Sequence, residues 1–185
     1  MKNTAHSLNE IESKFSDESF LENKGLSNEV GIYIHFYPPK DEMIVRNYFD
    51  NLKCQSDAPY NIIECDLYKI FLNICEDKHI LKSIPSMEEK KGGKYLLSQL
   101  QKIATPEAFV ARMDYSPHKK GDILLITGVG KVYPFMRAHN ILDNIQHIFS
   151  DIPVVMLYPG TYNGQDLRLF DKFFDGNYYR AFNLL

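Results

Sequence analysis

Residues 121–170 read GDILLITGVGKVYPFMRAHNILDNIQHIFSDIPVVMLYPGTYNGQDLRLF, and this stretch decides the fold. Two short, continuous apolar runs stand in it, Ile123–Ile126 and Val154–Leu157. Unbroken runs of this length are typical of strands that are buried on both faces, as in a parallel sheet. Between them, apolar residues recur at helical spacing at Ala138, Ile141, Leu142, Ile145, Ile148 and Phe149. The stretch therefore predicts a right-handed βαβ crossover within an α/β fold, whose mostly parallel sheet is flanked by helices.

A glycine-bearing segment follows each apolar run. The first reads Thr127-Gly128-Val129-Gly130-Lys131, and the second reads Tyr158-Pro159-Gly160-Thr161-Tyr162. In an open α/β sheet, ligands and partners bind beyond the carboxyl ends of the strands. We therefore expect both segments to be loops at one end of the sheet, and we expect the functional residues to lie there.

The sequence before residue 77 predicts a further βαβ pattern. Val30–Phe36 and Ile62–Cys65 are rich in β-branched and aromatic residues and predict two strands, the first of which ends at Pro38-Pro39. The helix between them is expected to bury a stripe of three residues, Ile44, Tyr48 and Leu52. Asp66 is expected to cap the next helix, whose apolar side carries Leu67, Ile70, Phe71, Ile74 and Cys75.

Residues 77–115 predict a helical excursion from the sheet, within a single domain that spans residues 1–185. From Asp77 to Lys94 the chain is charged and has no period, which excludes another strand. Helical spacing resumes over Leu96–Ile103, and Thr105 precedes a proline at the first position of a further helix.

The two ends of the chain predict smaller elements. Leu8, Ile11 and Phe15 give an amphipathic start at helical spacing. After the second glycine segment, Leu167–Phe174 predicts a short helix or strand, and Tyr178–Leu185 predicts an edge strand. In the central stretch, Pro134 is expected to open the helix that follows the first glycine segment.

Composition limits the function classes. With 185 residues, 44% of them hydrophobic, the chain can bury one sizeable core. A formal net charge of -3 argues against a protein that is basic throughout, such as a typical nucleic-acid binder, although a local basic patch remains compatible with it. Three spaced cysteines predict reduced, mostly buried thiols. No run has the apolar length of a spanning helix or a secretory leader, so we expect a cytoplasmic protein without a membrane partner.

Gly128-Val129-Gly130-Lys131 resembles the end of a phosphate-binding loop, but the match fails at two positions. A P-loop requires glycine where this chain has Leu125, and serine or threonine where it has Val132. A dinucleotide fingerprint also fails, because no third glycine follows at the required spacing. We therefore expect a P-loop-NTPase-like or Rossmann-like core without a functional nucleotide loop, and no cofactor.

The sequence carries no complete catalytic or metal-binding motif. It has no HExxH, nucleophile elbow or EF-hand spacing, and its histidines stand singly at His6, His35, His79, His118, His139 and His147. Single histidines more often have surface or structural roles than act as ligands or bases. We therefore predict that the protein is not an enzyme and holds no metal.

A partner-binding surface is the remaining interpretation of the region beyond the sheet. Tyrosine and arginine are enriched in interface hot spots, and glycines allow close backbone approach. The alternative is that the aromatic residues form an edge of the core. The predicted partner-binding residues are Gly128, Gly130, Lys131, Tyr133, Arg137, Pro159, Gly160, Thr161, Tyr162, Arg168, Tyr178, Tyr179 and Arg180.

The same region resembles a known family. The motifs are Thr127–Phe135 (TGVGKVYPF), Pro153–Met156, Pro159–Gln165, Leu167–Phe170 and Asn177–Phe182. In this order they are similar to the BrxB family, the small components of bacterial BREX phage-defence systems. Weaker likeness at Leu21–Asn28, Lys40-Asp41-Glu42 and Asp66-Leu67-Tyr68 extends the resemblance over nearly the whole chain, except residues 77–94, which match no motif.

The resemblance implies an accessory protein without established catalytic residues. Its expected partner is the PglZ alkaline-phosphatase-like protein, with the BrxC ATPase and the PglX methyltransferase as further components. The system as a whole methylates host DNA and excludes phage. The alternative is a degenerate nucleotide- or nucleic-acid-binding protein that holds phosphate with Lys131, Arg137 and Arg168, and a direct DNA contact stays open.

Overall fold

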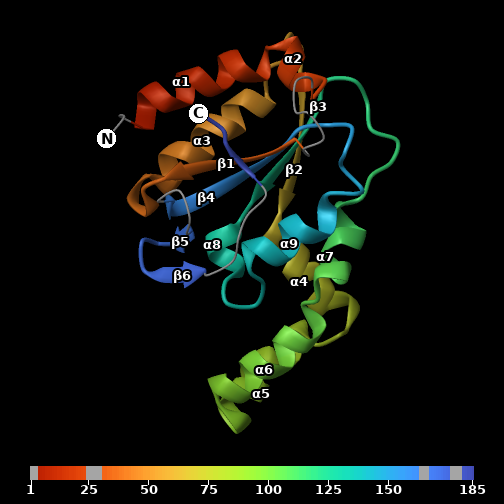
Figure 1. Cartoon of the computed structure of the whole chain (residues 1–185). Helices are drawn as coiled ribbons and strands as arrows, with labels where there is room; N and C mark the ends of the chain where they lie inside the picture. Colours follow the sequence, from red (N-terminus) through yellow and green to blue (C-terminus); the bar gives the residue numbers. More distant parts are fainter. Residues whose placement is uncertain (1–3, 24–30, 163–166, 176–180) are drawn as a thin grey trace.

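The computed structural model describes residues 4–23, 31–162, 167–175 and 181–185. They form a sheet with helices on both faces, so the predicted α/β class is confirmed (Figure 1). The central strands run parallel and confirm all four strands that the sequence predicts there. Across the sheet, the order is β2 (Asn61–Asp66), β3 (Asp122–Thr127), β4 (Val154–Tyr162), β1 (Ile32–Tyr37) and β7 (Phe182–Asn183).

One face of the sheet is covered by α1 (Thr4–Phe15), α2 (Glu18–Leu21) and α3 (Glu42–Lys53) (Figure 1). A short 3₁₀ turn, Pro39–Asp41, connects β1 to α3. The buried stripe of α3 consists of Val45, Phe49 and Leu52, whereas the predicted Ile44 is 54% exposed. The predicted and the observed stripe both have helical spacing and share Leu52, but their other two positions differ by one residue. Spacing alone therefore allows either stripe, and packing against the sheet selects the observed one.

The other face is covered by α4 (Leu67–Asp77), α7 (Pro106–Met113), α8 (Val129–Val132) and α9 (Ala138–Ile145). Asp66 caps α4 as predicted, because its Oδ1 accepts the N–H groups of Tyr68 at 2.9 Å and Lys69 at 3.2 Å. The prediction that Pro134 opens a helix is wrong. The carbonyl of Val132 accepts the N–H of Phe135 at 2.8 Å, which forms a turn before α9 begins.

The predicted excursion is helical and projects away from the sheet (Figure 1). It contains a 3₁₀ turn (Leu81–Ser83), α5 (Ile84–Lys91) and α6 (Gly93–Ile103). We call residues 78–103 the helical arm. Among the described residues, we find no helix that combines the length and apolar character needed to cross a membrane.

β4 continues beyond the parallel sheet into an antiparallel hairpin. Its partners there are β5 (Leu167–Leu169) and, next to β5, β6 (Phe173–Asp175). Of the short helix or strand that the sequence predicts over Leu167–Phe174, the strand is therefore confirmed. β7 pairs with β1 at the sheet edge, so the described end of the predicted edge strand is confirmed.

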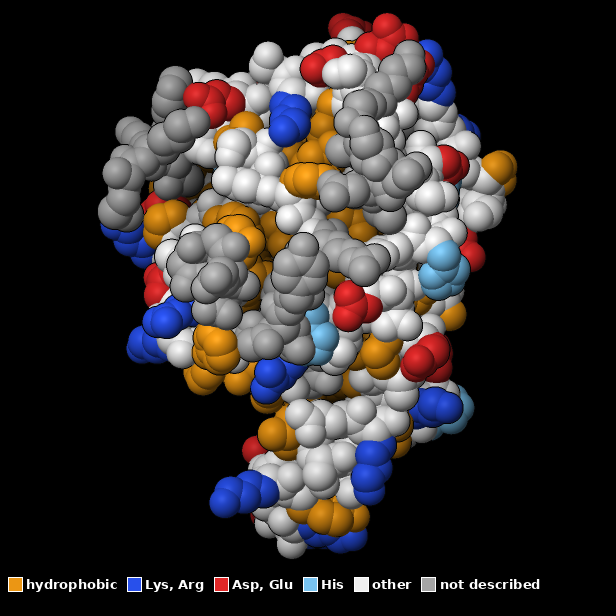
Figure 2. Space-filling model, in the orientation of Figure 1, with side chains coloured by type: hydrophobic (Ala, Val, Ile, Leu, Met, Phe, Trp, Pro, Cys, Tyr) orange, Lys and Arg blue, Asp and Glu red, His pale blue; other side chains and the backbone are white. Residues whose placement is uncertain are grey.

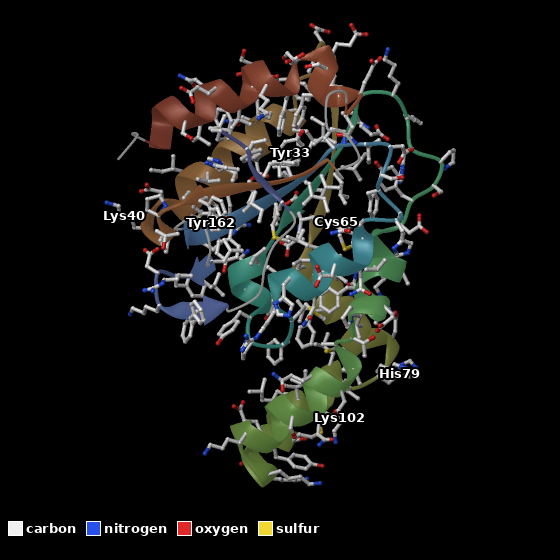
Figure 3. The ribbon with its side chains drawn as sticks, in the orientation of Figure 1. Tyr33, Lys40, Cys65, His79, Lys102 and Tyr162 are labelled. Atoms are coloured by element: carbon white, nitrogen blue, oxygen red, sulfur yellow. The ribbon has the colours of Figure 1, made fainter. Side chains whose placement is uncertain are left out.

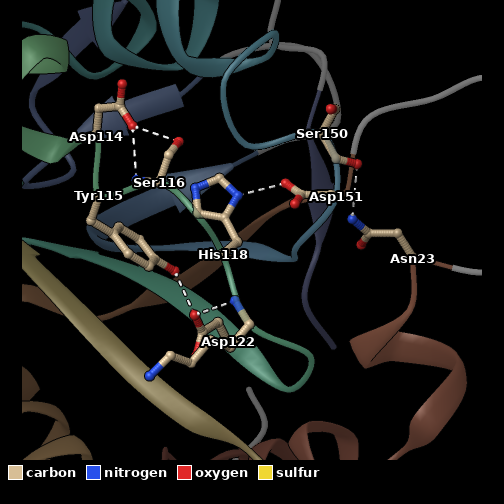
Figure 4. Close-up of polar contacts among 9 residues, drawn as sticks. Asn23, Asp114, Tyr115, Ser116, His118, Asp122, Ser150 and Asp151 are labelled. Carbon is tan, nitrogen blue, oxygen red and sulfur yellow. Dashed lines mark hydrogen bonds and ion pairs between the residues drawn. The ribbon is translucent and has the colours of Figure 1, made fainter.

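A buried carboxylate fixes the amino-terminal end of β3 (Figure 4). Asp122 accepts hydrogen bonds from Asn61 Nδ2 at 2.8 Å, Tyr115 Oη at 3.3 Å and the N–H of Lys119 at 2.9 Å. Burial and the Asp122 charge raise the pKa of Tyr115, so the phenol stays protonated and acts as a donor. This network lies at the amino-terminal end of β3, whereas the first glycine segment follows its carboxyl end. We therefore interpret the network as structural.

Candidate interaction site

The first glycine segment is a tight turn that leads from β3 into the short helix α8. Gly128 adopts a left-handed backbone conformation with φ 74°. Its carbonyl accepts the N–H groups of Lys131 at 3.1 Å and Val132 at 2.9 Å. The chain therefore reverses immediately after the buried strand, and Gly130 and Lys131 become part of α8.

A carboxylate borders this turn. Asp66, the cap of α4, lies against Gly128, and a side chain at position 128 would overlap its Oδ1. A phosphate group at the turn would meet the negative charge of Asp66 at short range, which is unfavourable. The electrostatics of the turn thus oppose phosphate binding, in line with its missing P-loop residues.

The second glycine segment belongs to β4, so the prediction of a loop is wrong here. Residues 160–162 pair antiparallel with residues 167–169. Their backbone groups find hydrogen-bond partners in β5, a strand that local sequence did not define. A methyl group on Gly160 would overlap the carbonyl oxygen of Arg168, so this close pairing requires glycine.

The structure brings the two glycine segments together. Gly130 lies against the ring of Phe170 and the Cγ of Pro159. Just after α8, the ring centroid of Tyr133 lies 5.0 Å from that of Phe173 on β6. These contacts hold the β5–β6 hairpin against α8.

Three large aromatic side chains remain exposed on this extension. Phe174 is 57% exposed, Phe173 is 45% exposed and Tyr162 is 42% exposed. Tyr162 stands at the end of β4 (Figure 3) and stacks on Phe36 with ring centroids 5.4 Å apart. Clustered exposed apolar side chains mark interaction sites on soluble proteins more often than single ones do.

Basic side chains accompany these rings. Lys131, Arg168 and Lys172 are exposed, and none of the three forms an ion pair within the ranges that the structure describes. Figure 2 shows hydrophobic and basic side chains next to each other over the hairpin. Because their charges are not neutralised by neighbours, they are available to a negatively charged partner.

A small cavity of about 20 Å³ opens between the hairpin and the start of α9. Tyr133, Arg137, Phe173 and Phe174 are among the residues that line it. This volume holds about one water molecule and is too small for a cofactor. We call the surrounding surface the aromatic–basic face and define it as Tyr133, Arg137, Tyr162, Arg168, Lys172, Phe173 and Phe174.

The predicted site residues divide into three groups. Tyr133, Arg137, Tyr162 and Arg168 belong to the aromatic–basic face, and exposed Lys131 and Thr161 lie on α8 and β4. The remaining described residues shape the backbone beneath this face, namely Gly128, Gly130, Pro159 and Gly160. The last group, Tyr178, Tyr179 and Arg180, lies outside the described residues.

Sequence reasoning missed Lys172, Phe173 and Phe174. A local signal existed, since two adjacent phenylalanines follow the charged pair Asp171-Lys172. Phe170 and Asp171 both have positive φ, at 55° and 60°, and form the turn of the hairpin. The sequence predicts only a short helix or strand over Leu167–Phe174, and the exposure of the two phenylalanines depends on which of these forms and on what packs against it.

A polar cleft between α3 and the ends of β2 and β3 was also missed. It has a volume of about 140 Å³. Lys53 pairs with Asp50 at 2.7 Å and with Glu64, which also accepts a hydrogen bond from Thr127 Oγ1 at 2.8 Å. Partial burial opposes ionisation of Glu64, but the bonds from Lys53 and Thr127 prevail and lower its pKa. These charges satisfy one another, and the residues come from three elements, so no linear motif could reveal them.

Reactive side chains in the described part of the chain include a histidine–aspartate pair, His118 Nδ1 with Asp151 Oδ1 at 2.6 Å (Figure 4), and the cysteines. No three His, Cys, Asp or Glu side chains there are grouped to hold a metal ion. Cys65 and Cys75 are buried free thiols as predicted, whereas Cys54 is exposed. Burial raises the pKa of Cys65 to about 11 and lowers the pKa of His35 to about 4, so both side chains are neutral at pH 7.

Comparison with known proteins identifies the family. The family model described as "BREX protein BrxB" matches residues 63–184. A BrxB protein of Bacillus cereus (strain H3081.97) is 40% identical over 190 residues, which cover all of this chain and 99% of the relative. A BrxB protein of Escherichia coli O9:H4 (strain HS) is 29% identical over 185 residues, 96% of this chain and 90% of the relative. No solved structure matches significantly. The chain therefore belongs to the BrxB family of BREX systems.

Proposed function

We propose that this chain is a non-catalytic docking component of a BREX anti-phage defence system and binds a PglZ-like protein through the aromatic–basic face. The observation that carries the proposal is the exposure of Phe173, Phe174 and Tyr162 next to Arg168 and Lys172, two cations that form no ion pair with any residue the structure describes. The chain would support host-DNA methylation and phage exclusion by assembly rather than by chemistry. A BrxC-like ATPase and a PglX-like methyltransferase are further candidate partners.

The composition of this face supports a protein partner. Interface hot spots are enriched in aromatic residues and arginine, and the aromatic–basic face exposes three aromatic residues and two arginines, namely Tyr162, Phe173, Phe174, Arg137 and Arg168. Phe174 and Arg168 lie largely outside the core, so folding does not require the first to be apolar or the second to be charged. The complementary surface is expected to combine apolar groups with carboxylates.

The backbone beneath the face supports the proposal as well. The hairpin is held by the Tyr133–Phe173 contact and by the stack of Tyr162 on Phe36. A surface that is already ordered loses less conformational entropy when it binds than a flexible loop does. The exposed rings can therefore contribute more of their burial energy to affinity.

The non-catalytic part of the proposal rests on the chemistry of the described side chains. In the polar cleft Lys53 pairs with Asp50 and Glu64, and the buried thiol of Cys65 is protonated at pH 7. The start of α3, where a helix could bind an anion, carries Asp41 and Glu42 instead. These features disfavour a bound phosphate or an activated nucleophile.

A second candidate function is phosphate binding by Lys131 on α8 together with Arg137 and Arg168 of the aromatic–basic face, all of which are exposed. The carboxylate of Asp66 beside Gly128 opposes it. A thermal-shift screen with ATP, GTP and DNA separates the two functions. A ligand at a hundred times its dissociation constant stabilises the native state by about 2.7 kcal/mol, whereas a pure docking protein shows no shift.

The docking proposal is tested by co-purification and titration with the PglZ-like protein of the same system. Phe174→Ala and Arg168→Ala should each weaken binding by about 2 kcal/mol, which is roughly thirtyfold. Tyr95→Ala is the matched control, because Tyr95 is also an exposed aromatic residue but lies on α6 in the helical arm. If both test variants melt like wild type and bind with wild-type affinity, docking uses another surface.

A further inference from the structure

We propose that the helical arm binds the phosphate backbone of duplex nucleic acid, at a site separate from the aromatic–basic face. The arm carries six of the 21 basic residues of the chain but only two of its 24 acidic residues. The remainder of the chain is therefore strongly acidic, and positive charge is concentrated on the one element that projects from it (Figure 1). The six are Lys78, Lys82, Lys90, Lys91, Lys94 and Lys102.

The arm is held in place by its apolar side, and its lysines make only local contacts, such as Lys91 Nζ over the Tyr95 ring at 4.6 Å. Leu96 and Leu100 are buried, and half-buried Ile84 and Met87 pack against the same core cluster. All six lysines are exposed, and none of them forms an ion pair within the described ranges. Figure 3 shows Lys102 on the projecting part of the arm. The side of the arm that faces solvent thus differs chemically from the side that holds it in place.

Helix electrostatics explain some of these positions but not all. Lys90 and Lys91 lie in the last turn of α5, where a cation favours the helix dipole. Lys94 lies in the first turn of α6, where a cation opposes the dipole and where the first turn contains no acidic residue. The three lysines flank the connection at Gly92, and together they outnumber the carboxylates of Glu88 and Glu89 at this junction. Local stability does not account for this excess of positive charge, whereas an anionic partner does.

The choice of residues points to phosphate rather than to a protein surface. The arm has lysine as its only strong cation, no arginine, and Tyr95 as its one aromatic residue. Lysine is depleted in protein interfaces, where arginine and aromatic residues dominate. Phosphate contacts in nucleic acids need only positive charge and are commonly made by lysine. The arm therefore has a composition suited to phosphate contacts, whereas the aromatic–basic face has a composition suited to a protein interface.

The spacing points to an extended polyanion. Lys94 and Lys102 stand near opposite ends of α6, about 12 Å apart along the helix axis. A free phosphate or a mononucleotide cannot contact both, but a duplex backbone carries charge at closer intervals than this over its whole length. The binding is expected to be independent of base sequence, because no side chain here is suited to reading base edges.

The test is a fluorescence-anisotropy titration of the full-length protein with a short labelled DNA duplex at several salt concentrations. The arm variant is Lys90→Gln, Lys91→Gln and Lys94→Gln together. The matched control removes the same charge from exposed positions on the body, Lys40→Gln, Lys69→Gln and Lys119→Gln. A third variant replaces the three arm lysines by arginine, which retains the charge.

We expect the arm variant to bind at least tenfold more weakly at low salt, and its slope of log K against log salt to fall by two to three, about one for each lysine. The control and the arginine variant should bind like wild type within about twofold. Equal losses in the arm variant and the control, or no duplex binding by wild-type protein at low salt, would overturn the proposal. So would an arm variant that keeps duplex binding but no longer co-purifies with its protein partner, because the arm would then contact an acidic protein surface.

Discussion

Tyr133 and Phe173 lie with their ring centroids 5.0 Å apart, although forty residues separate them in the sequence. This contact joins the end of α8 to β6 and thereby fixes the hairpin that displays Phe174. The aromatic–basic face is thus built by a tertiary contact between the two glycine segments rather than by either segment alone.

This contact should be measurable as a coupling energy. Tyr133→Ala, Phe173→Ala and the double variant are expected to give a coupling of about 1 kcal/mol in the free energy of unfolding, because packed aromatic pairs exceed their simple burial energy by this order. Urea denaturation of the four proteins provides the measurement. Additive effects of the two single substitutions would show that the ring contact contributes nothing to holding the hairpin.

Gly160→Ala should destabilise the protein by about 1 to 3 kcal/mol, since the added methyl group overlaps the backbone carbonyl of Arg168 and forces β4 and β5 apart. Gly93→Ala is the control. The nearest atom to a methyl group there is Glu88 Oε1 at 3.4 Å, and alanine favours the helix. Equal melting temperatures for Gly160→Ala and wild type would mean that the antiparallel pairing tolerates wider spacing.

Asp122→Ala should lower the free energy of unfolding by about 2 to 4 kcal/mol. The substitution leaves the donors of Asn61, Tyr115 and Lys119 without their acceptor in a buried position. Figure 4 shows the contact of Tyr115 with Asp122. Asp114→Ala removes an exposed carboxylate that bonds only to Ser116 and should cost less than about 1 kcal/mol. Similar losses for the two variants would contradict a special role for the network at the start of β3.

His35 should make the stability of the protein sensitive to mild acid. Burial lowers its pKa from 6.5 to about 4 in the folded state, so between these values the unfolded chain binds a proton that the folded protein does not. Stability is therefore expected to fall as the pH drops below 6.5 and to be constant, as far as His35 contributes, above about pH 7.

The His35→Leu variant isolates this contribution. Between pH 7 and pH 4, wild-type protein should lose on the order of 2 kcal/mol more stability than the variant, because one pKa unit corresponds to about 1.4 kcal/mol. Urea unfolding of both proteins at several pH values measures the difference. Parallel pH curves would show that His35 is protonated as easily in the folded state as in the unfolded chain.

Purified protein on its own is expected to show no ATPase, nuclease or methyltransferase activity. The described side chains lack an assembled metal site, and Asp41, Glu42 and Asp66 carry negative charge at the helix start and the turn where phosphate would bind. Activity should be measured across the peak of a sizing column. Turnover that follows the protein peak and disappears in Lys131→Ala would refute this prediction.

Local sequence determined most of the parallel sheet and its helices. The apolar runs at Ile123–Ile126 and Val154–Leu157 became the central strands, and Asp66 became the cap of α4. These features depend on neighbours a few residues apart: strand burial appears as a continuous apolar run, and a cap needs only one oxygen near two N–H groups. The family was likewise readable from the order of short motifs.

Tertiary structure decided what local patterns leave open. Two stripes on α3 have helical spacing, and packing against the sheet buries Val45 and leaves Ile44 exposed. Gly160 looked like a loop residue until β5 supplied partners for its backbone. Phe174 and the lysines of the helical arm are exposed because no other described element covers them, which local sequence does not show. The common physical reason is that burial and hydrogen-bond pairing are set by contacts between residues distant in sequence, whereas a linear pattern records only which side chains are available for them.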